Sequence, residues 1–357
     1  MDGGYDMKKY FFVILLIGMF ICLFNISIYA ADKVLVYAAL DSPTLEAIAS
    51  EFKNETGIDV EWILGGAGEM AVRVRAEKDR PQADVFIGGS VDVHGDLAKD
   101  GLLAKISPEN AKAIPSQFID PEGQYFGWYL GLLGLVLNTE MLEQEMPGTL
   151  PPKTWDDLLA PEWKGNVVSS SPASSGGAYI FIANMIFRFT ELAHYFGFEG
   201  DAAIEAGEKA AWNWFREFDQ NVDLYMAKAT EPITVTSQGE YVVGMSWAHD
   251  ILVSVEQGLP VELIIPPYTG FEIGGVSAIK GGPNPDSALK FVNFVLSEKS
   301  QEINATVGAK RYPTRPGVVS PPNSPDISGV VLTKYNRDWA IANRERLLEL
   351  WEDLTNK

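Results

Sequence analysis

Strand-like and helix-like runs alternate at the start of the folded part of the chain. Three apolar runs have the length and composition of buried strands, at 33–39, 58–64 and 83–87. Runs with helical periodicity, at 45–56 and 70–78, separate them. Strands and helices in this order and at this spacing form βαβ units, which require a parallel sheet. We therefore predict an α/β fold.

The extreme N-terminus has a different character. Lys8 and Lys9 precede an apolar run at 10–23, and the small residue Ala30 follows shortly afterwards. A basic start, a short apolar core and a small residue at the cleavage point are typical of a secretory signal peptide. We predict that residues 1–30 are a signal peptide and that the mature protein is periplasmic. Translation from Met1 and from Met7 are both compatible with such a signal.

Cysteine content limits the chemistry of the mature protein. The single cysteine, Cys22, lies within the predicted signal. Lipoprotein anchoring at Cys22 is an alternative, but the bulky residues at 19–21 disfavour lipid modification. After cleavage at Ala30 no cysteine remains, which excludes disulfides, thiol nucleophiles and cysteine–metal sites.

Length and charge narrow the class of partner. The chain has 357 residues, enough for two domains, and a net charge of −20. A strongly acidic protein is poorly suited to nucleic acid, so we expect no nucleic-acid partner. A small anion stays possible as a ligand, because local amides can bind it despite the global charge.

The rest of the chain continues the alternation. The predicted strands and helices are, in order, 125–129, 130–138, 154–159, 165–170, 178–187, 203–218, 240–247, 261–265, 274–279, 287–297 and 339–354. Turns rich in glycine and serine follow several of these strands. Ligands of open α/β sheets bind at the carboxyl ends of the strands. Two sheets whose carboxyl edges face each other would therefore form a binding cleft.

The turn at 171–177 (SPASSGG) is the clearest candidate for binding an anion. It follows the strand 165–170 and opens an apolar helix. The backbone N–H groups and the dipole at a helix N-terminus favour negative charge. Serine and glycine also begin many helices as ordinary caps, so both interpretations stay open for Ser174, Ser175, Gly176 and Gly177 at this point.

Four short motifs, in this order, resemble those of the solute-binding proteins of ABC importers, in particular the ferric-ion-binding and sugar-phosphate-binding branch. They lie at 55–60 (ETGIDV), 81–86 (PQADVF), 154–158 (TWDDL) and 281–288 (GGPNPDSA). The resemblance covers nearly the whole mature chain. It implies a type II periplasmic binding fold without enzymatic activity or cofactor, which delivers its ligand to a permease and the associated ATPase subunit. We expect such a protein to be a monomer.

The same resemblance implies a division into two lobes that close on the ligand like a hinge. We expect the first lobe to comprise residues 31–129 and 267–320. The second lobe would comprise residues 130–266, and a C-terminal helical segment, 321–357, would pack on the lobes.

The resemblance also implies ligand residues. Ferric-ion members carry two adjacent tyrosines where this chain has His249 and Asp250. Sugar-phosphate members have a His-Asp pair there and a later glutamate, which matches Glu272. Carboxylates accept hydrogen bonds from hydroxyls, so these three residues would bind a polyol. The phosphate would lie on the serine-glycine turn, with further donors expected from Ser42, Gly66, Ala67, Gly68 and Ser90.

Two alternatives stay open. Ferric iron could be bound by Tyr268, His249, Asp250 and Glu272, although Fe(III) prefers hard anionic oxygen ligands. An exported hydrolase could use Ser246 as nucleophile and His249 as base, but Ala248 stands where a nucleophile elbow has its last glycine.

Other notable side chains have simpler interpretations. We interpret His94 and His194 as structural or surface residues. The basic segment 310–316 is predicted to be structural, with Arg311 or Tyr312 as its possible ligand contact. Four tryptophans are assigned to the core: Trp128, Trp155, Trp212 and Trp214.

Overall fold

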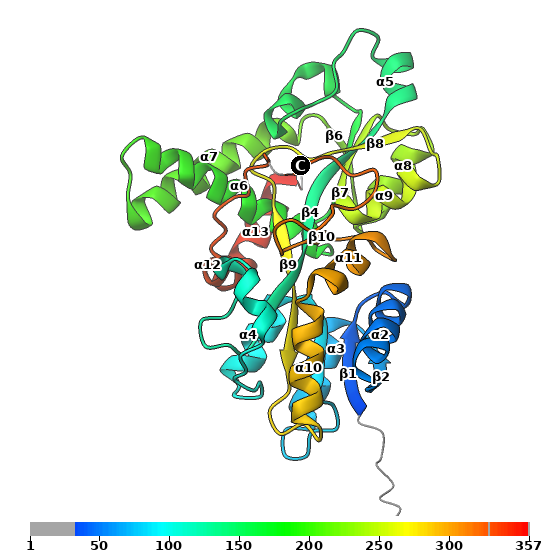
Figure 1. The fold of residues 1–357 in the computed structure, drawn as a ribbon. Helices are drawn as coiled ribbons and strands as arrows, with labels where there is room; N and C mark the ends of the chain where they lie inside the picture. The colour runs from blue at the N-terminus through cyan, green and yellow to red at the C-terminus, as the bar shows by residue number, and fades with distance from the viewer. Residues whose placement is uncertain (1–32, 328, 356–357) are drawn as a thin grey trace, which may run out of the picture.

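Figure 1 shows the computed structural model of the protein, which describes residues 33–327 and 329–355. The predicted signal peptide, with Cys22 and both possible start residues, lies outside the described residues. Within the described part, no helix has the length and apolar character needed to cross a membrane.

The predicted βαβ units are present at the N-terminal end of the described chain. Their elements are β1 (Lys33–Ala39), α2 (Ser42–Thr56), β2 (Asp59–Leu64), α3 (Ala67–Ala76), β3 (Val85–Ser90) and α4 (Val91–Lys99). Strand β1 pairs in parallel with both β2 and β3. Gly57 ends α2 in the left-handed conformation, with φ 73°, as expected of a glycine cap. Helix α4 was not predicted from the sequence.

A single long strand, β4 (Phe126–Asn138), runs through the middle of the molecule (Figure 1). Up to Leu132 it pairs with β9 (Phe271–Ala278) and β10 (Tyr312–Pro313). From Leu133 onward it pairs with β7 (Val243–Trp247), and from Leu135 also with β8 (Val261–Ile264). Because β4 is continuous, the two sheets expected from the sequence are joined into one ten-stranded arrangement.

The second half of this arrangement is again partly parallel. Strand β5 (Val167–Ser170) pairs in parallel with β7 and with β6 (Val222–Met226), which was not predicted. The remaining α-helices are α5 (Thr139–Glu145), α6 (Gly176–Tyr195), α7 (Gly200–Phe218), α8 (Glu231–Ser237), α9 (Ala248–Glu256), α10 (Pro285–Val295), α11 (Glu298–Thr306), α12 (Arg337–Ala342) and α13 (Arg344–Thr355). Short 3₁₀ helices lie at Glu109–Ala113, Ser116–Phe118, Trp155–Leu159 and Pro161–Trp163.

The C-terminal helix predicted at 339–354 is wrong in one respect, because the structure has two helices there. Asn343 separates α12 from α13. Its side-chain amide donates to the Trp339 carbonyl at 2.9 Å. The backbone N–H of Asn343 donates to the same carbonyl at 3.0 Å, and the Asn343 carbonyl accepts from the Leu347 N–H at 2.9 Å, so backbone hydrogen bonds continue past the boundary between the two helices.

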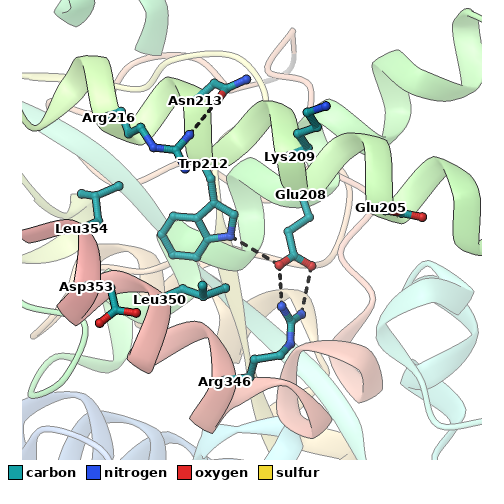
Figure 2. A pocket seen from close by; sticks show the side chains of 10 residues that line it. All are labelled: Glu205, Glu208, Lys209, Trp212, Asn213, Arg216, Arg346, Leu350, Asp353 and Leu354. Carbon is teal, nitrogen blue, oxygen red and sulfur yellow. Dashed lines mark hydrogen bonds and ion pairs between the residues drawn. The ribbon is translucent and has the colours of Figure 1, made fainter.

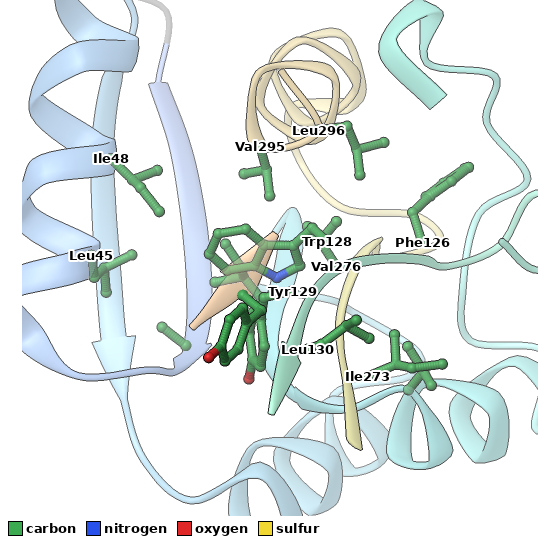
Figure 3. Close-up of a cluster of buried hydrophobic side chains, with 14 of the residues drawn as sticks. Leu45, Ile48, Phe126, Trp128, Tyr129, Leu130, Ile273, Val276, Val295 and Leu296 are labelled. Carbon is green, nitrogen blue, oxygen red and sulfur yellow. The ribbon is translucent and has the colours of Figure 1, made fainter. Parts of the chain in front are cut away.

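The hydrophobic core extends across both halves of the sheet. Trp128 and Tyr129 of β4 lie between Leu45 and Ile48 of α2 on one side and Ile273 of β9 on the other (Figure 3). A second cluster packs α6, α7 and α13 against β5 and β7. The four tryptophans assigned to the core from the sequence are all buried.

Candidate functional site

Three helices begin at the carboxyl edge of the first sheet half. Asp41 caps α2 and accepts a hydrogen bond from the Thr44 N–H at 3.0 Å, which leaves Ser42 in the first turn. Ser90 caps α4 and accepts from the Asp92 N–H at 3.2 Å. Gly66 caps α3 without a side-chain hydrogen bond, so Ala67 and Gly68 lie in its first turn. Parallel strands bring these three turns to one edge, as the sequence predicted.

The serine-glycine turn opens α6 in the second half. The Ser175 hydroxyl caps the helix, accepting from the Ala178 N–H at 3.4 Å, and the Ser174 hydroxyl donates to the Ala227 carbonyl at 2.8 Å. The N–H groups of Ser174 and Ser175 both donate to the Ser171 carbonyl. The hydroxyls therefore hold the turn together. The first-turn amides of Gly176 and Gly177 have no acceptor within the helix and are therefore free to donate to an anion.

Trp247 connects this turn to the predicted polyol residues. A Cβ added to Gly177 would lie 3.0 Å from the Trp247 ring, so the absence of a side chain lets the indole approach the helix. The same ring stacks on His249, with 6.0 Å between centroids. The first turn of α6 and the start of α9 are thus neighbours.

His249 and Asp250 lie in the first turn of α9, with His249 Nε2 3.8 Å from Asp250 Oδ1. Glu272 lies on β9 opposite Gly131 of β4, where an added Cβ would be 2.8 Å from Glu272 Cγ. A glycine at position 131 therefore makes room for the glutamate side chain.

Burial raises the pKa of the Asp250 and Glu272 carboxyls, and the charge of Arg311 opposes that rise. Burial, assisted by Arg311, lowers the pKa of His249 well below its usual value. The imidazole of His249 is therefore neutral at pH 7 and can both donate and accept hydrogen bonds.

Arg311 lies next to these residues and was only a secondary candidate from the sequence. Its Nη1 pairs with Asp41 Oδ2 at 3.4 Å, and its guanidinium lies 4.9 Å from the centre of the Tyr129 ring. Sequence reasoning missed Asp41 and Tyr129 as neighbours of the site. Asp41 has the signature of a helix cap and Tyr129 that of a core strand residue. The position of Asp41 directly after β1, next to Ser42, was the available signal.

Several polar atoms of His249, Asp250, Glu272 and Arg311 make no hydrogen bond with any described residue. His249 Nδ1 and Arg311 Nε are buried without a hydrogen-bond partner. Within residues 33–327 and 329–355, neither the Asp250 nor the Glu272 carboxylate accepts a hydrogen bond from another side chain or amide. Buried polar groups are normally satisfied, so this arrangement is suited to a polar ligand.

A cavity of about 960 Å³ adjoins Glu272. Its lining includes Ser90, Asp92, Glu272, Tyr335 and Arg337. Arg337, from the C-terminal segment, forms an ion pair with Asp92 at the start of α4. The cavity therefore brings Ser90 and Glu272, two predicted site residues, to one space.

The residues proposed for the hydrolase and for the ferric-iron carrier have other roles in the structure. Ser246 Oγ donates to the Ala229 carbonyl at 2.6 Å, an acceptor unrelated to His249. Tyr268 has a positive φ of 57° and is held through its backbone by Val331 and Asn184. The described residues contain no group of three or more His, Cys, Asp or Glu side chains arranged to hold a metal ion.

Two histidines are structural, as expected. His94 is buried, stacks on Phe86, and bonds Ser277 Oγ at 2.8 Å and the Gly88 carbonyl at 3.0 Å. Burial lowers the pKa of His94 to about 4. His194 is exposed, and its Nδ1 lies 2.9 Å from the Phe198 carbonyl.

A separate groove lies between α7 and α13 (Figure 2). Glu208 bonds both Arg346, with 2.6 Å between the closest atoms, and the Trp212 indole at 3.4 Å. None of the predicted site residues lines this groove. Its charged groups hold the C-terminal helix onto α7.

The family of the chain follows from comparison with known proteins. Residues 80–329 match the model of the bacterial extracellular solute-binding proteins. The chain belongs to this family, and it is the solute-binding component of an ABC importer rather than an enzyme.

Individual relatives cover almost the whole chain. An uncharacterised protein of Haemophilus influenzae is 30% identical over 330 residues, 90% of each chain. The periplasmic binding protein AfuA from Actinobacillus pleuropneumoniae, solved with exogenous fructose-6-phosphate bound, is 29% identical with a TM-score of 0.68, over 91% of this chain and 99% of its own. A Bordetella ferric binding protein has a TM-score of 0.72 at 20% identity, over 90% of this chain and 99% of its own, and shows the fold alone.

Proposed function

We propose that this protein captures a phosphorylated small organic solute, a sugar phosphate or a phosphonate, between its two lobes. The phosphate lies on the first turn of α6, with the Gly176 and Gly177 amides as donors. The hydroxyl-bearing part of the solute lies against His249, Asp250 and Glu272. Amides at the starts of α2, α3 and α4 add donors from the first lobe.

The observation that carries this proposal is the set of polar side chains around His249 that lack hydrogen-bond partners in the described part of the chain. Two carboxylates with free acceptor positions lie near an imidazole and a guanidinium that each have an unpaired buried nitrogen. Several hydroxyls on one molecule would satisfy acceptors and donors together. The similarity to AfuA, solved with fructose-6-phosphate, supports the same class of ligand.

We further propose a hinge at the crossing strands, with the mature protein acting as a monomer in the periplasm. The partners of β4 change between Leu132 and Leu133, close to the lobe boundary expected at 129/130. Closure would bury the ligand, and the closed form would dock on the permease.

Ferric iron is the second candidate, and the observation in its favour is the similarity to iron uptake protein A1 of Synechocystis, which is 22% identical over 301 residues. The proposed ligands are Tyr268, His249, Asp250 and Glu272. The His-Asp pair at 249–250 weighs against this candidate, because Fe(III) prefers hard anionic oxygens.

A thermal-shift screen of the mature protein tests the proposal. The compounds are sugar phosphates, phosphonates, inorganic phosphate, and Fe(III) with citrate. A ligand at a hundred times its Kd should add about 2.7 kcal/mol to the free energy of unfolding. A shift with Fe(III) and with no phosphorylated compound would contradict the proposal, and a visible absorption band would identify an Fe(III)–tyrosinate complex.

A further inference from the structure

Arg311 contacts one carboxylate and acts electrostatically on two more. The guanidinium interacts electrostatically with Glu272, Asp41 and Asp250. Of these, the ion pair with Asp41 is a direct contact, at 3.4 Å. Within the described residues, Asp250 and Glu272 form no ion pair with Arg311 within 4.0 Å. The Arg311 charge therefore lies near the Asp250 and Glu272 carboxylates and leaves them available as hydrogen-bond acceptors.

The position of this charge is fixed by its surroundings. The guanidinium packs on the Tyr129 ring, and that ring fills the space where a Gly274 side chain would be, since an added Cβ would lie 1.9 Å from it. On the other side, Gly308 has a φ of 62°, and an added Cβ would lie 2.0 Å from Asp41 Oδ1. The Arg311 side chain is 14% exposed. The guanidinium is therefore already in place before a ligand binds.

The charge has a chemical consequence for the ligand. Three carboxylates without a cation would attract an ammonium group strongly, because water screens charges poorly in such a site. Arg311 compensates one of these three negative charges and repels an incoming ammonium group, so the site attracts a cation less strongly with Arg311 than without it. A hydroxyl carries no charge, can donate to a carboxylate, and can accept from the guanidinium.

We propose that Arg311 shifts specificity at this end of the cleft away from ammonium groups and toward neutral hydroxyl groups. This inference rests on the proposed function, since it concerns the part of a phosphorylated solute that lies away from the phosphate. It bears on one property of the ligand, the balance between a phosphorylated polyol and a phosphorylated amine.

Two matched ligand pairs test the inference by titration calorimetry at pH 7. The first is glucose 6-phosphate with glucosamine 6-phosphate, and the second is 2-hydroxyethylphosphonate with 2-aminoethylphosphonate. Within each pair, a hydroxyl is replaced by an amine. The ratio of the two Kd values in the unchanged protein is the reference. In Arg311→Gln the ratio of the two Kd values should move toward the amine by about tenfold or more.

Three further variants separate charge from structure. Arg311→Lys keeps the charge and should keep the ratio of the unchanged protein. Asp41→Asn removes a negative charge and should shift the ratio the opposite way, toward the hydroxyl. Arg315→Gln is the control, because Arg315 Nη1 bonds the Leu296 carbonyl at 3.2 Å and the side-chain oxygen of Asn110 at 3.4 Å, away from the cluster.

The outcomes distinguish a failure of the proposed function from a failure of the role of Arg311. If the unchanged protein binds neither member of either pair, the proposed function is wrong and this inference falls with it. If both members bind and Arg311→Gln leaves their ratio unchanged, the role of Arg311 alone is wrong. Should Arg311→Gln fail to fold, an unchanged ratio in Asp41→Asn would be the overturning result.

Discussion

The two ends of the proposed site are built in different ways. At the start of α6, side-chain hydroxyls are used to hold the turn, and backbone amides are left for the ligand. Around Arg311, charged side chains meet with their hydrogen-bonding capacity unfilled. The amide end exists as a consequence of helix geometry and costs little stability. Burying the charged side chains around Arg311 costs free energy. Substitutions at this end should therefore change the stability of the free protein more than substitutions at the amide end.

The largest effect is expected from a negative charge placed at the amide end, the start of α6. No atom lies within 4 Å of a Cβ added to Gly176, so Gly176→Asp fits without a clash. Its carboxylate should take the place of the anion and weaken phosphorylated ligands by about a hundredfold or more. The free protein should keep its stability, because an acidic residue is favourable at a helix N-terminus. Calorimetry gives the Kd, and Gly176→Ala is the control. Equal affinity in the two variants would show that the phosphate lies elsewhere.

The charged end should matter for the organic part of the ligand. Asp250→Asn removes a charged acceptor and should weaken a sugar phosphate by about tenfold to a hundredfold. Inorganic phosphate, which does not reach this end, should bind nearly unchanged. Competition binding with both compounds measures the difference. An equal loss for both would contradict the division between the two ends.

The cost of the charged end should appear in the stability of the free protein. Because burial raises the pKa of Glu272, ionising this residue at pH 7 opposes folding. Glu272→Gln should therefore raise the free energy of unfolding at pH 7, by less than about 2 kcal/mol, while weakening the sugar phosphate. The advantage of the variant should vanish as the pH falls through the raised pKa. Urea unfolding at pH 7 and pH 4 tests this, and a less stable variant at pH 7 would contradict it.

The smallest expected effect concerns His249, whose pKa lies well below its usual value of 6.5. As the pH falls below 6.5, the unfolded chain takes up a proton that the folded protein does not, so stability is lost. His249→Gln should lose less stability between pH 7 and pH 5, by up to about 1.4 kcal/mol per pH unit. Parallel pH series of unfolding free energies measure this difference. Identical series would show that His249 has the same pKa in the folded and unfolded protein.

Much of the fold was predictable because it depends on local patterns. The apolar runs and caps identified β1, α2, β2 and the 3₁₀ helix after Thr154, where the capping box with Asp157 is present. The helix α4 was missed because its glycine and buried His94 weaken the helical pattern. The break at Asn343 was missed because neither glycine nor proline marks it in the sequence.

The site was predictable at one end and only partly at the other. A turn such as 171–177 identifies a helix start from its sequence alone, and the structure places Gly176 and Gly177 in that first turn. The assignment of its hydroxyls needed the structure, since Ser174 bonds Ala227, which is distant in sequence. Arg311 lay in a recognised basic segment, but its partner Asp41 comes from the opposite end of the chain.

The amino-acid sequence by itself determined the α/β class, the order of elements and the pair His249-Asp250, because periodicity, caps and adjacent residues are local properties. The tertiary structure alone decided that β4 joins both halves, and that Arg311 contacts Asp41 and Tyr129 while its charge acts on Asp250 and Glu272. The reason is physical. Electrostatic neighbours are set by the distance between side chains in space, and the pairing of distant strands creates that proximity.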